Sequence, residues 1–299
     1  MPILLSNEIL DSVKKELQNA TDSVQIITAY CKESTFLYLN NCINPEVRTK
    51  KLLVRFRMDD IVKGSTDFSI LNLGLSLKWE VYVRFDLHAK TYIIDNKRGL
   101  VGSANATNCG LSVGKSGNME MATLIDVESQ DVEKIDMLYN DAIRVDEVLL
   151  NEMKMQLDSI EITNMDDSYS WNSTITNLFH PNINTLFSYE LPEDFCLTQG
   201  EYFSFIDEVF LGDKCKLKDS FRWSNAYIWL LKILQDSGGC LFFGELSAKL
   251  HDALISDPKP YRREVKQMLA NLLSLIEVLE MEEIIIDKPN YSQRIRIKK

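Results

Sequence analysis

Short apolar segments alternate with amphipathic ones through the first 127 residues of this chain, and this alternation restricts its fold more than any other feature. Apolar runs of high β-propensity predict strands over residues 23–29, 51–57, 79–85 and 121–127. The segments between them predict helices over residues 6–19 and 35–43, and a third that follows a turn at 58–64 and ends near Gly74. Ser6 is the predicted cap of the first helix. Strands that alternate with helices favour an α/β fold in which helices cover both faces of a sheet.

The next hundred residues predict one helix and one connector. Residues 128–157 carry apolar side chains at helical spacing, which predicts a single long amphipathic helix after the last strand of the domain. Packing on the sheet is its expected role, and a dimer interface or a link to the next domain is the alternative. Residues 160–220 are polar and rich in turn-forming residues, so we expect a connector with short elements.

A group of polar residues follows the third predicted strand, and it consists of His88, Lys90, Asp95, Ser103 and Asn105. His88 and Lys90 are two residues apart, so on an extended strand their side chains project from the same face. An ammonium is a phosphate-binding point charge, and an imidazole is the side chain best suited to act as a nucleophile or proton carrier near neutral pH. A turn after Asp95 predicts a hairpin that returns Asn105 towards His88, with Gly102 allowing a close backbone approach. The group therefore predicts a pocket for a phosphodiester.

These residues form the pattern H-x-K-x4-D-x6-G-S-x-N, and over roughly residues 1–150 the chain resembles the phospholipase D superfamily, whose signature is this HKD motif. The resemblance implies a sandwich in which helices cover a mixed sheet, and a metal-independent reaction without a cofactor. It also implies that His88 attacks phosphorus to give a phosphohistidine, while Lys90 and Asn105 bind the phosphate oxygens and Ser103 supports them. Asp95 matches a motif position that usually has a structural role in the family. Glu120 lies where family members carry an acid that hydrogen-bonds the catalytic imidazole.

Family members need two copies of the motif, and this chain contains one. Its other histidines, His180 and His251, are not followed by lysine at the motif spacing. The resemblance therefore implies a homodimer, in which His88 is the nucleophile in one subunit and the general acid in the other.

The last 79 residues predict helices over 225–235, 243–254 and 261–279, followed by a hairpin of strands at 283–287 and 293–297. This mainly α arrangement resembles a winged-helix domain, whose third helix would enter a major groove of DNA. The candidate DNA-binding residues are Arg262, Arg263, Lys266, Lys288, Arg294 and Arg296. Winged helices also serve as protein-binding or dimerisation modules, and that alternative stays open.

The formal net charge of −11 is concentrated in the middle of the chain. Residues 126–220 hold 21 acidic and 6 basic side chains, a net of −15, whereas the segments on either side are each at +2. The acidic segment is either a solvated surface or a surface that repels nucleic acid everywhere except at the site. Whole-chain charge is therefore no argument against DNA binding. The predicted domains are a catalytic domain at 1–158, an acidic connector at 159–220 and a winged-helix-like domain at 221–299.

Neither a basic apolar leader nor a run of about 18 apolar residues is found, which predicts a cytoplasmic protein with no membrane span. The six cysteines are scattered without a C-x2-C pair, which argues against a zinc site or a disulfide framework. We expect neither a metal nor a cofactor.

A DNA endonuclease with a role in restriction or phage defence is the function that these features together predict. One alternative is a phospholipase or another phosphodiesterase that does not act on nucleic acid, and the other is a non-catalytic nucleic-acid-binding module. No G-x4-G-K-[ST] loop is present, so ATP-driven translocation would require a separate ATPase or helicase subunit.

Overall fold

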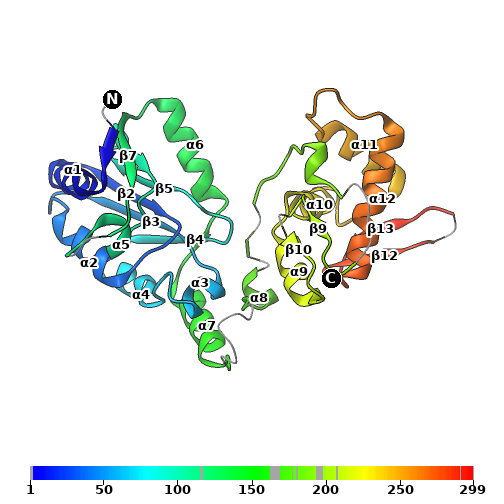
Figure 1. Cartoon of the computed structure of the whole chain (residues 1–299), viewed down its shortest axis with the longest axis horizontal. Coiled ribbons are helices and arrows are strands. Elements are labelled where there is room, and N and C mark those ends of the chain that lie inside the picture. The colour runs from blue at the N-terminus through cyan, green and yellow to red at the C-terminus, as the bar shows by residue number, and fades with distance from the viewer. Residues whose placement is uncertain are drawn as a thin grey trace. The chain divides into compact units, whose positions relative to one another are not determined.

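The chain divides into two compact units, Met1–Phe179 and His180–Lys299, coloured blue to green and green to red in Figure 1. The computed structural model describes residues 3–114, 117–161, 169–176, 178–179, 181–192, 198–206, 208–289 and 291–298. The predicted domain boundaries at residues 158 and 220 lie on either side of the division between the units. In the described part of the chain, no helix is both long enough and apolar enough to cross a membrane.

An eight-stranded mixed sheet forms the centre of the N-terminal unit. Its strands are β1 (Ile3–Leu5), β2 (Ser23–Thr28), β3 (Thr49–Arg55), β4 (Glu80–Arg84), β5 (Lys90–Ile94), β6 (Arg98–Gly102), β7 (Met121–Asp126) and β8 (Ile143–Arg144). Their spatial order is β1-β7-β6-β5-β2-β3-β4-β8. Strands β2, β3 and β4 are parallel, and every other neighbouring pair is antiparallel. The predicted α/β fold with a mixed sheet is confirmed.

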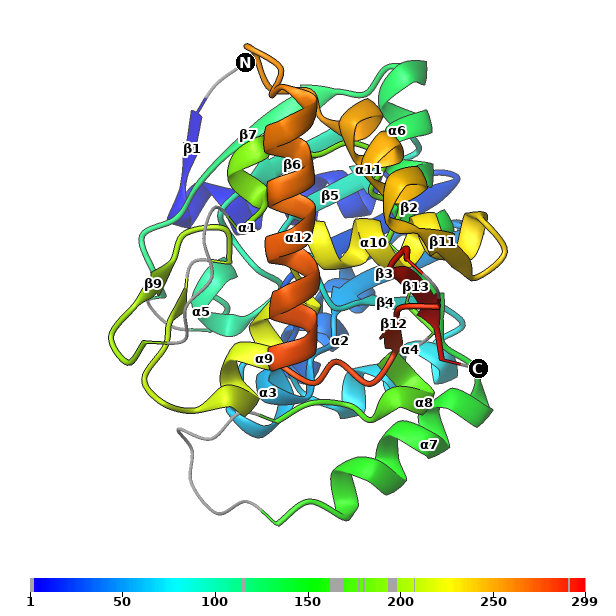
Figure 2. The same ribbon diagram turned by 90° about the vertical axis from the view of Figure 1, so that its right-hand side faces the viewer.

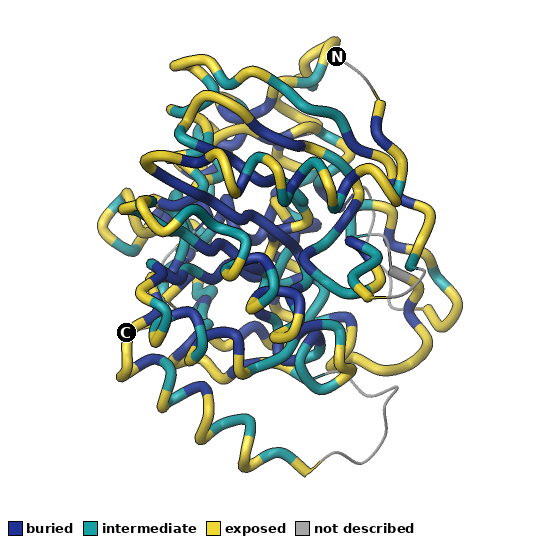
Figure 3. Tube along the Cα trace, turned by 90° about the vertical axis from the view of Figure 1, so that its left-hand side faces the viewer, coloured by how far each residue is buried: buried dark blue, intermediate teal, exposed yellow. Residues whose placement is uncertain are grey.

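Helices cover both faces of this sheet. The helices of this unit are α1 (Ser6–Asn19), α2 (Glu33–Cys42), α3 (Met58–Val62), α4 (Ser69–Ser76), α5 (Asn108–Leu111), α6 (Ser129–Asn140), α7 (Glu147–Asp158) and α8 (Ser173–Thr176). Figure 1 shows α1, α2 and α5 on one side of the strands and α6 on the other. On its side, α6 packs Tyr139 against Ile27 of β2 and Leu53 of β3. The strands appear in Figure 3 as buried, dark blue runs, whereas the outer turns of the helices are yellow and exposed.

Strands β5 and β6 form the predicted hairpin. Asp95 and Asn96 fill its two-residue turn with φ values of 53° and 50°, a conformation that Asp and Asn tolerate better than most residues. The Lys97 N–H closes the turn on the Ile94 carbonyl at 3.0 Å. At the other end of β6, a Cβ on Gly102 would lie 2.4 Å from the Met121 carbonyl oxygen. Only glycine therefore allows β6 and β7 to approach this closely.

The prediction of one long helix over residues 128–157 is wrong. Helix α6 ends at Asn140, and the chain then forms β8, which pairs with β4 at the far edge of the sheet. The Val145 N–H extends this pairing by donating to the Val81 carbonyl at 2.8 Å. The Asp146 carboxylate then caps α7 by accepting from the Leu149 N–H at 2.8 Å. Apolar spacing could not reveal the break, because both helices and the strand bury apolar side chains.

Two smaller expectations also differ from the structure. Helix α1 spans the predicted residues, but the Ser6 hydroxyl does not cap it. This hydroxyl donates to the Asn118 carbonyl at 2.9 Å and accepts from the Glu120 N–H at 2.7 Å, so it ties α1 to the start of β7. The Glu8 carboxylate accepts from the Leu5 N–H instead. The predicted turn at 58–64 contains the short helix α3.

Part of the segment expected to be a connector packs on the N-terminal unit. Trp171 is 3% exposed, and its indole N–H donates to the Phe56 carbonyl at 2.6 Å. The Trp171 and Phe56 rings are stacked, with centroids 6.2 Å apart. The Tyr169 N–H donates to Asp59 at 2.7 Å. These contacts fix Tyr169 and Trp171 next to the end of β3.

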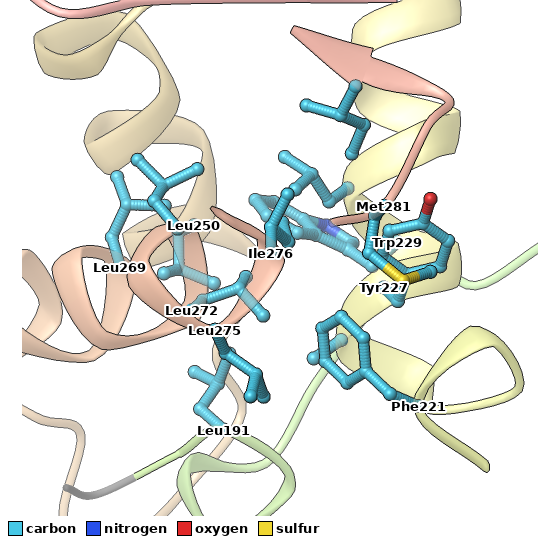
Figure 4. Packing of buried hydrophobic residues seen from close by; sticks show 14 of the residues in the cluster. Leu191, Phe221, Tyr227, Trp229, Leu250, Leu269, Leu272, Leu275, Ile276 and Met281 are labelled. Carbon is cyan, nitrogen blue, oxygen red and sulfur yellow. The ribbon is translucent and has the colours of Figure 1, made fainter. Parts of the chain in front are cut away.

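The C-terminal unit is mainly helical. Its elements are a 3₁₀ turn (Ser188–Glu190), β9 (Tyr202–Phe203), β10 (Glu208–Val209), α9 (Lys214–Arg222), α10 (Asn225–Asp236), β11 (Cys240–Phe242), α11 (Phe243–Ala253), α12 (Arg262–Val278), β12 (Ile284–Asp287) and β13 (Arg294–Ile297). Helices α11 and α12 lie side by side (Figure 2). Their apolar faces meet α10 in one core that includes Tyr227, Trp229 and Ile276 (Figure 4).

The three predicted helices and the predicted hairpin of this unit are all present. Strand β11 was not expected, and it joins the hairpin in a three-stranded sheet of order β11-β13-β12. Helix α9 was not expected either, and it buries Leu217 and Phe221 in the same core. Three residues are few for a strand, so β11 gives little signal in the sequence.

Candidate active site

The candidate site lies at one edge of the sheet, where three parallel strands end and an antiparallel one begins. Strands β2, β3 and β4 end at this edge, and β5 starts here because it runs in the opposite direction. Lys90, the first residue of β5, pairs with Thr28, the last residue of β2, and Thr28 pairs with Val54 of β3. The carboxyl ends of parallel strands are the usual place for a ligand site in an open α/β sheet.

His88 lies just before β5, and its side chain is exposed. The expectation that His88 and Lys90 share one strand is therefore corrected, because the strand begins only at Lys90. The two residues are still close, since the Lys90 ammonium donates to the His88 main-chain carbonyl at 2.7 Å. This bond fixes the backbone of His88 and keeps the positive charge beside the imidazole.

Asn105 reaches the same edge from the loop after β6. Its Oδ1 accepts from the Tyr30 N–H at 3.0 Å and from the Thr28 hydroxyl at 3.3 Å. The amide N–H of Tyr30 can only donate, so the oxygen of the Asn105 side chain must face it. The Asn105 NH2 group then points the other way, where it can donate to an anion.

Ser103 and Glu120 form a pair beside this group. The Ser103 hydroxyl donates to Glu120 Oε2, while Asn118 donates to Oε1 at 3.3 Å. Glu120 is 9% exposed, so burial next to the start of β7 fixes its carboxylate. No hydrogen bond between Glu120 and the imidazole of His88 is found among the described residues, which corrects the expected contact. Glu120 instead acts on Lys90, whose pKa it raises against the stronger lowering by burial and Arg55.

Asp95 lies at the opposite end of β5 from the other motif residues. Asp95 follows Lys90 by five positions, which on an extended strand is a distance of about 17 Å. Its carboxylate accepts main-chain N–H groups of Thr21, Asp22 and Ser23 at 2.8–3.0 Å, and the Thr21 hydroxyl at 2.9 Å. These bonds lower its pKa. Asp95 therefore holds the hairpin to the start of β2 and does not reach the reacting group.

A positive field acts on His88. Burial lowers the pKa of the imidazole, and Lys90, Arg55 and Arg57 lower it further, with Asp60 acting weakly in the opposite direction. The lowered pKa favours the neutral ring near pH 7, which is the form that can attack phosphorus. The same field favours the binding of an anion.

Sequence reasoning missed two residues of this edge, Tyr30 and Asp60. Arg55 ends β3, and its Nε and Nη2 donate to the two oxygens of Asp60 at 2.8 Å each. Its Nη2 also donates to the Tyr30 hydroxyl at 2.6 Å, and its guanidinium lies 4.7 Å from the centroid of the Tyr30 ring. Their positions in the sequence could have indicated them, because Tyr30 follows the end of β2 and Asp60 follows the end of β3.

Not all candidate residues of the C-terminal unit are available to a ligand. Arg262, Arg263 and Lys266 are exposed at the start of α12. Arg294, by contrast, donates twice to Asp287 at 2.8 Å, and Arg296 lies 3.5 Å from the same carboxylate.

The remaining candidates do not add to the site. Lys288 is exposed after β12, and His251 lies on α11 in the other unit. His180 lies outside the described residues. In the part of the chain that is described, no three His, Cys, Asp or Glu side chains are grouped so that they could hold a metal ion.

A comparison with protein-family models gives one match. Residues 13–140 match the family model described as "Cardiolipin synthase, PLD-like domain". No match is found among curated proteins.

Three similar solved structures each cover just under half of the chain. NucT from Helicobacter pylori is 17% identical over 46% of this chain and 93% of its own, with a TM-score of 0.34. Nuc from Salmonella typhimurium, a phospholipase D family member, is 16% identical over 48% and 96%, with a TM-score of 0.36. A phosphatidylserine synthase from Haemophilus influenzae Rd KW20 is 14% identical over 46% and 36%, with a TM-score of 0.38.

Proposed function

We propose, from the match of residues 13–140 to a PLD-like family model, that the chain is a metal-independent phosphodiesterase of the phospholipase D superfamily that cleaves DNA through a phosphohistidine. The family match supports an enzyme that acts on phosphodiesters. The observation that carries the proposal is the grouping of His88 with Lys90 and Asn105 at one edge of the sheet. A module that only binds nucleic acid has no need of a nucleophile in this position.

The proposed reaction begins when the neutral imidazole of His88 attacks phosphorus. A bond between nitrogen and phosphorus forms, the bond to the leaving oxygen breaks, and the phosphoryl group stays on His88. The ammonium of Lys90 and the NH2 group of Asn105 bind the oxygens that become more negative in this step. The leaving oxygen takes its proton from His88 of a second subunit, which enters this step as the imidazolium, the form that the negative charge of the bound phosphodiester favours. That second imidazole then removes a proton from water, which attacks the phosphohistidine and restores the free enzyme.

We further propose that the chain acts as a homodimer, because one chain supplies one motif histidine. An exposed apolar strip on β1, β6 and β7 is the surface where the second copy packs. It consists of Ile3, Leu5, Val101, Met119 and Met121, whose side chains are 40–84% exposed. Cross-strand pairing places Leu5 beside Met121, so strip residues from different strands share one face of the sheet. The strip borders the site, since Met119 and Met121 flank Glu120.

A substitution within the strip tests the dimer. Ile3→Lys places a charge in the strip, and we expect it to convert a dimer into a monomer and to remove activity. Val148→Lys on α7, where Val148 is 77% exposed, is the matched control and should leave the mass in solution unchanged. A dimeric Ile3→Lys protein would contradict this choice of surface.

DNA is the substrate that the charges near the site favour. Three cations, Lys90, Arg55 and Arg57, act on His88 from one chain, and a polyanion benefits from such a field more than a single phosphate does. The exposed basic residues at the start of α12 support the same substrate. A phospholipid phosphodiester is the second candidate, since the apolar strip beside the site would also suit a lipid.

Cleavage assays on the purified full chain separate these substrates. Supercoiled plasmid, single-stranded DNA and phospholipid vesicles are incubated with the protein in excess EDTA, beside His88→Ala. We expect DNA cleavage that survives EDTA, is lost in the variant, and leaves a trapped phosphohistidine after acid-free denaturation. A strict metal requirement, or activity confined to the vesicles, would refute the proposal.

A role in restriction or phage defence predicts that phage form fewer plaques on cells with the intact chain than on cells with His88→Ala.

A further inference from the structure

Thr28 ends β2 between the two residues that are proposed to bind the phosphate. Its main chain pairs with Lys90 of β5, so the two side chains lie next to each other on one face of the sheet. Its hydroxyl lies 3.3 Å from Oδ1 of Asn105, which reaches this point from the loop after β6. Thr28 is completely buried, whereas Lys90 and Asn105 are partly exposed. It therefore lies behind both phosphate ligands and does not itself reach a substrate.

The hydroxyl of Thr28 joins the two segments that hold Asn105. It accepts from the Ala106 N–H at 3.1 Å, and it donates to the Tyr30 carbonyl at 2.8 Å. The first bond fixes the loop at the residue after Asn105, and the second fixes the turn that follows β2. Because the hydroxyl carries one proton, the contact with the Tyr30 carbonyl is its stronger donation and the longer contact with Asn105 the weaker one.

The turn that is fixed in this way presents the Tyr30 N–H to Asn105. This N–H donates to Oδ1 of Asn105 at 3.0 Å, and it decides which end of the amide faces the protein. If the turn or the loop moved, the oxygen would lose this donor, and the amide could rotate so that its oxygen faced the phosphate. An oxygen in that position repels the anion that the NH2 group would bind.

We propose that Thr28 is a positioning residue of the reaction, which directs the NH2 group of Asn105 at the phosphoryl group in transfer. The inference rests on the proposed function and adds a residue outside the motif to its site. The Lys90 ammonium is a point charge on a flexible chain, whereas an amide donor acts only when it is directed at the oxygen that becomes more negative. Loss of the Thr28 hydroxyl should therefore lower kcat and leave KM nearly unchanged.

A purely structural role would also use this hydroxyl. Ala106 is completely buried, so its N–H needs an acceptor, and loss of that acceptor destabilises the fold. A lower Tm therefore does not separate the two roles, but kcat does. A structural hydroxyl leaves the kcat of the folded enzyme unchanged, whereas a positioning hydroxyl affects kcat only as long as Asn105 is present.

A double-mutant cycle between Thr28 and Asn105 separates the two roles. Full-length protein is assayed on bis(p-nitrophenyl) phosphate and on plasmid DNA, well below the lowest Tm of the set. Thr28→Val replaces the hydroxyl with a methyl group, and we expect kcat to fall about tenfold, against about a hundredfold for Asn105→Ala, which removes the donor itself. In the Asn105→Ala background, Thr28→Val should change kcat by about twofold or less.

Three further variants control for volume and folding. Thr28→Ser keeps the hydroxyl and should retain most of the kcat, while Thr28→Ala removes it from a smaller side chain and should act as Thr28→Val does. Thr66→Val is the matched control, because Thr66 is 1% exposed and its hydroxyl accepts from a different main-chain N–H, that of Cys31, at 3.4 Å. It should lower Tm and leave kcat in place. Circular dichroism gives the Tm of each protein.

The outcomes separate this inference from the function it rests on. An unchanged kcat in folded Thr28→Val and Thr28→Ala would overturn the positioning role and leave the phosphodiesterase intact. A loss of the same size in the Asn105→Ala background would do the same, because Thr28 would then act through another group. Unfolding of both variants would assign the hydroxyl to the fold and overturn the positioning role as well. If the unmodified protein hydrolyses neither the ester nor DNA, the proposed function fails, and the role of Thr28 fails with it.

Discussion

Replacing Asp95 with asparagine should destabilise the N-terminal unit without removing its chemistry. The Asp95 carboxylate accepts four hydrogen bonds that join the hairpin turn to residues 21–23. Asparagine has nearly the same shape and tolerates the positive φ at this position, so the variant removes little besides the charge and one acceptor. The new NH2 group would face the N–H and hydroxyl of Thr21, which are donors themselves.

The size of the effect follows from these bonds. A hydrogen bond to a charged group contributes about 1.5–3 kcal/mol, and a neutral one about half of that. Losing the bonds to Thr21 and weakening those to Asp22 and Ser23 should lower the free energy of unfolding by about 3 kcal/mol. For a unit of this size, that corresponds to a decrease in Tm of about 6–12 °C.

The pH dependence gives a second signature. The pKa of Asp95 is lower in the folded chain than in the unfolded chain, where it is about 3.9. The carboxylate therefore contributes its full stabilisation above the unfolded pKa, and this contribution is lost as the pH falls through the folded pKa. The difference in Tm between the two proteins should therefore be full at pH 7 and shrink in acid. Differential scanning calorimetry measures it, with Asp126→Asn as a control, because Asp126 is exposed at the end of β7. An unchanged Tm at pH 7, or a folded Asp95→Asn protein without phosphodiesterase activity, would refute the structural assignment.

Two further predictions concern the site itself. Arg57→Gln removes one of the charges that lower the pKa of His88, so the acid limb of the kcat profile should move to higher pH, whereas Arg48→Gln should leave it in place. Ser103→Ala and Glu120→Gln should be non-additive in kcat/KM, with a coupling of about 1 kcal/mol, because the two side chains share one hydrogen bond. Additive effects would show that Glu120 acts through another partner.

The sequence was sufficient for the long elements of the N-terminal unit and for the motif hairpin. Strand β2 is buried along its whole length, and β3 carries the apolar run Leu52–Val54, so both leave a local pattern in the sequence. Strands β1 and β8 were not predicted, because three and two residues carry too little pattern. They form at the sheet edges because pairing with β7 and β4 is available there. The break between α6 and α7 was missed for the same reason, since tertiary pairing interrupts a helical pattern.

The site was predictable as a list of residues, but its contacts were not. His88, Lys90 and Asn105 carry the motif, so their chemistry could be argued from residue type and spacing. The partner of Glu120 depends on how β6 and β7 approach each other at Gly102, and that approach places Ser103 closer to the carboxylate than His88. Contacts between residues far apart in the sequence require the fold.

The direction of β5 is what turns these residues into one site. In an all-parallel sheet, the start of a strand would lie at the edge opposite the carboxyl ends of its neighbours. Because β5 is antiparallel to β2, its first residue Lys90 meets the ends of β2 and β3, where Tyr30 and Arg55 lie. The reversal thus brings His88, the proposed nucleophile, to the edge where Arg55 and Arg57 lie, and it places Asp95 at the other edge. The mixed sheet therefore explains why the motif aspartate supports the fold, while Arg55, which is outside the motif, lies at the same edge as His88 and acts on its imidazole.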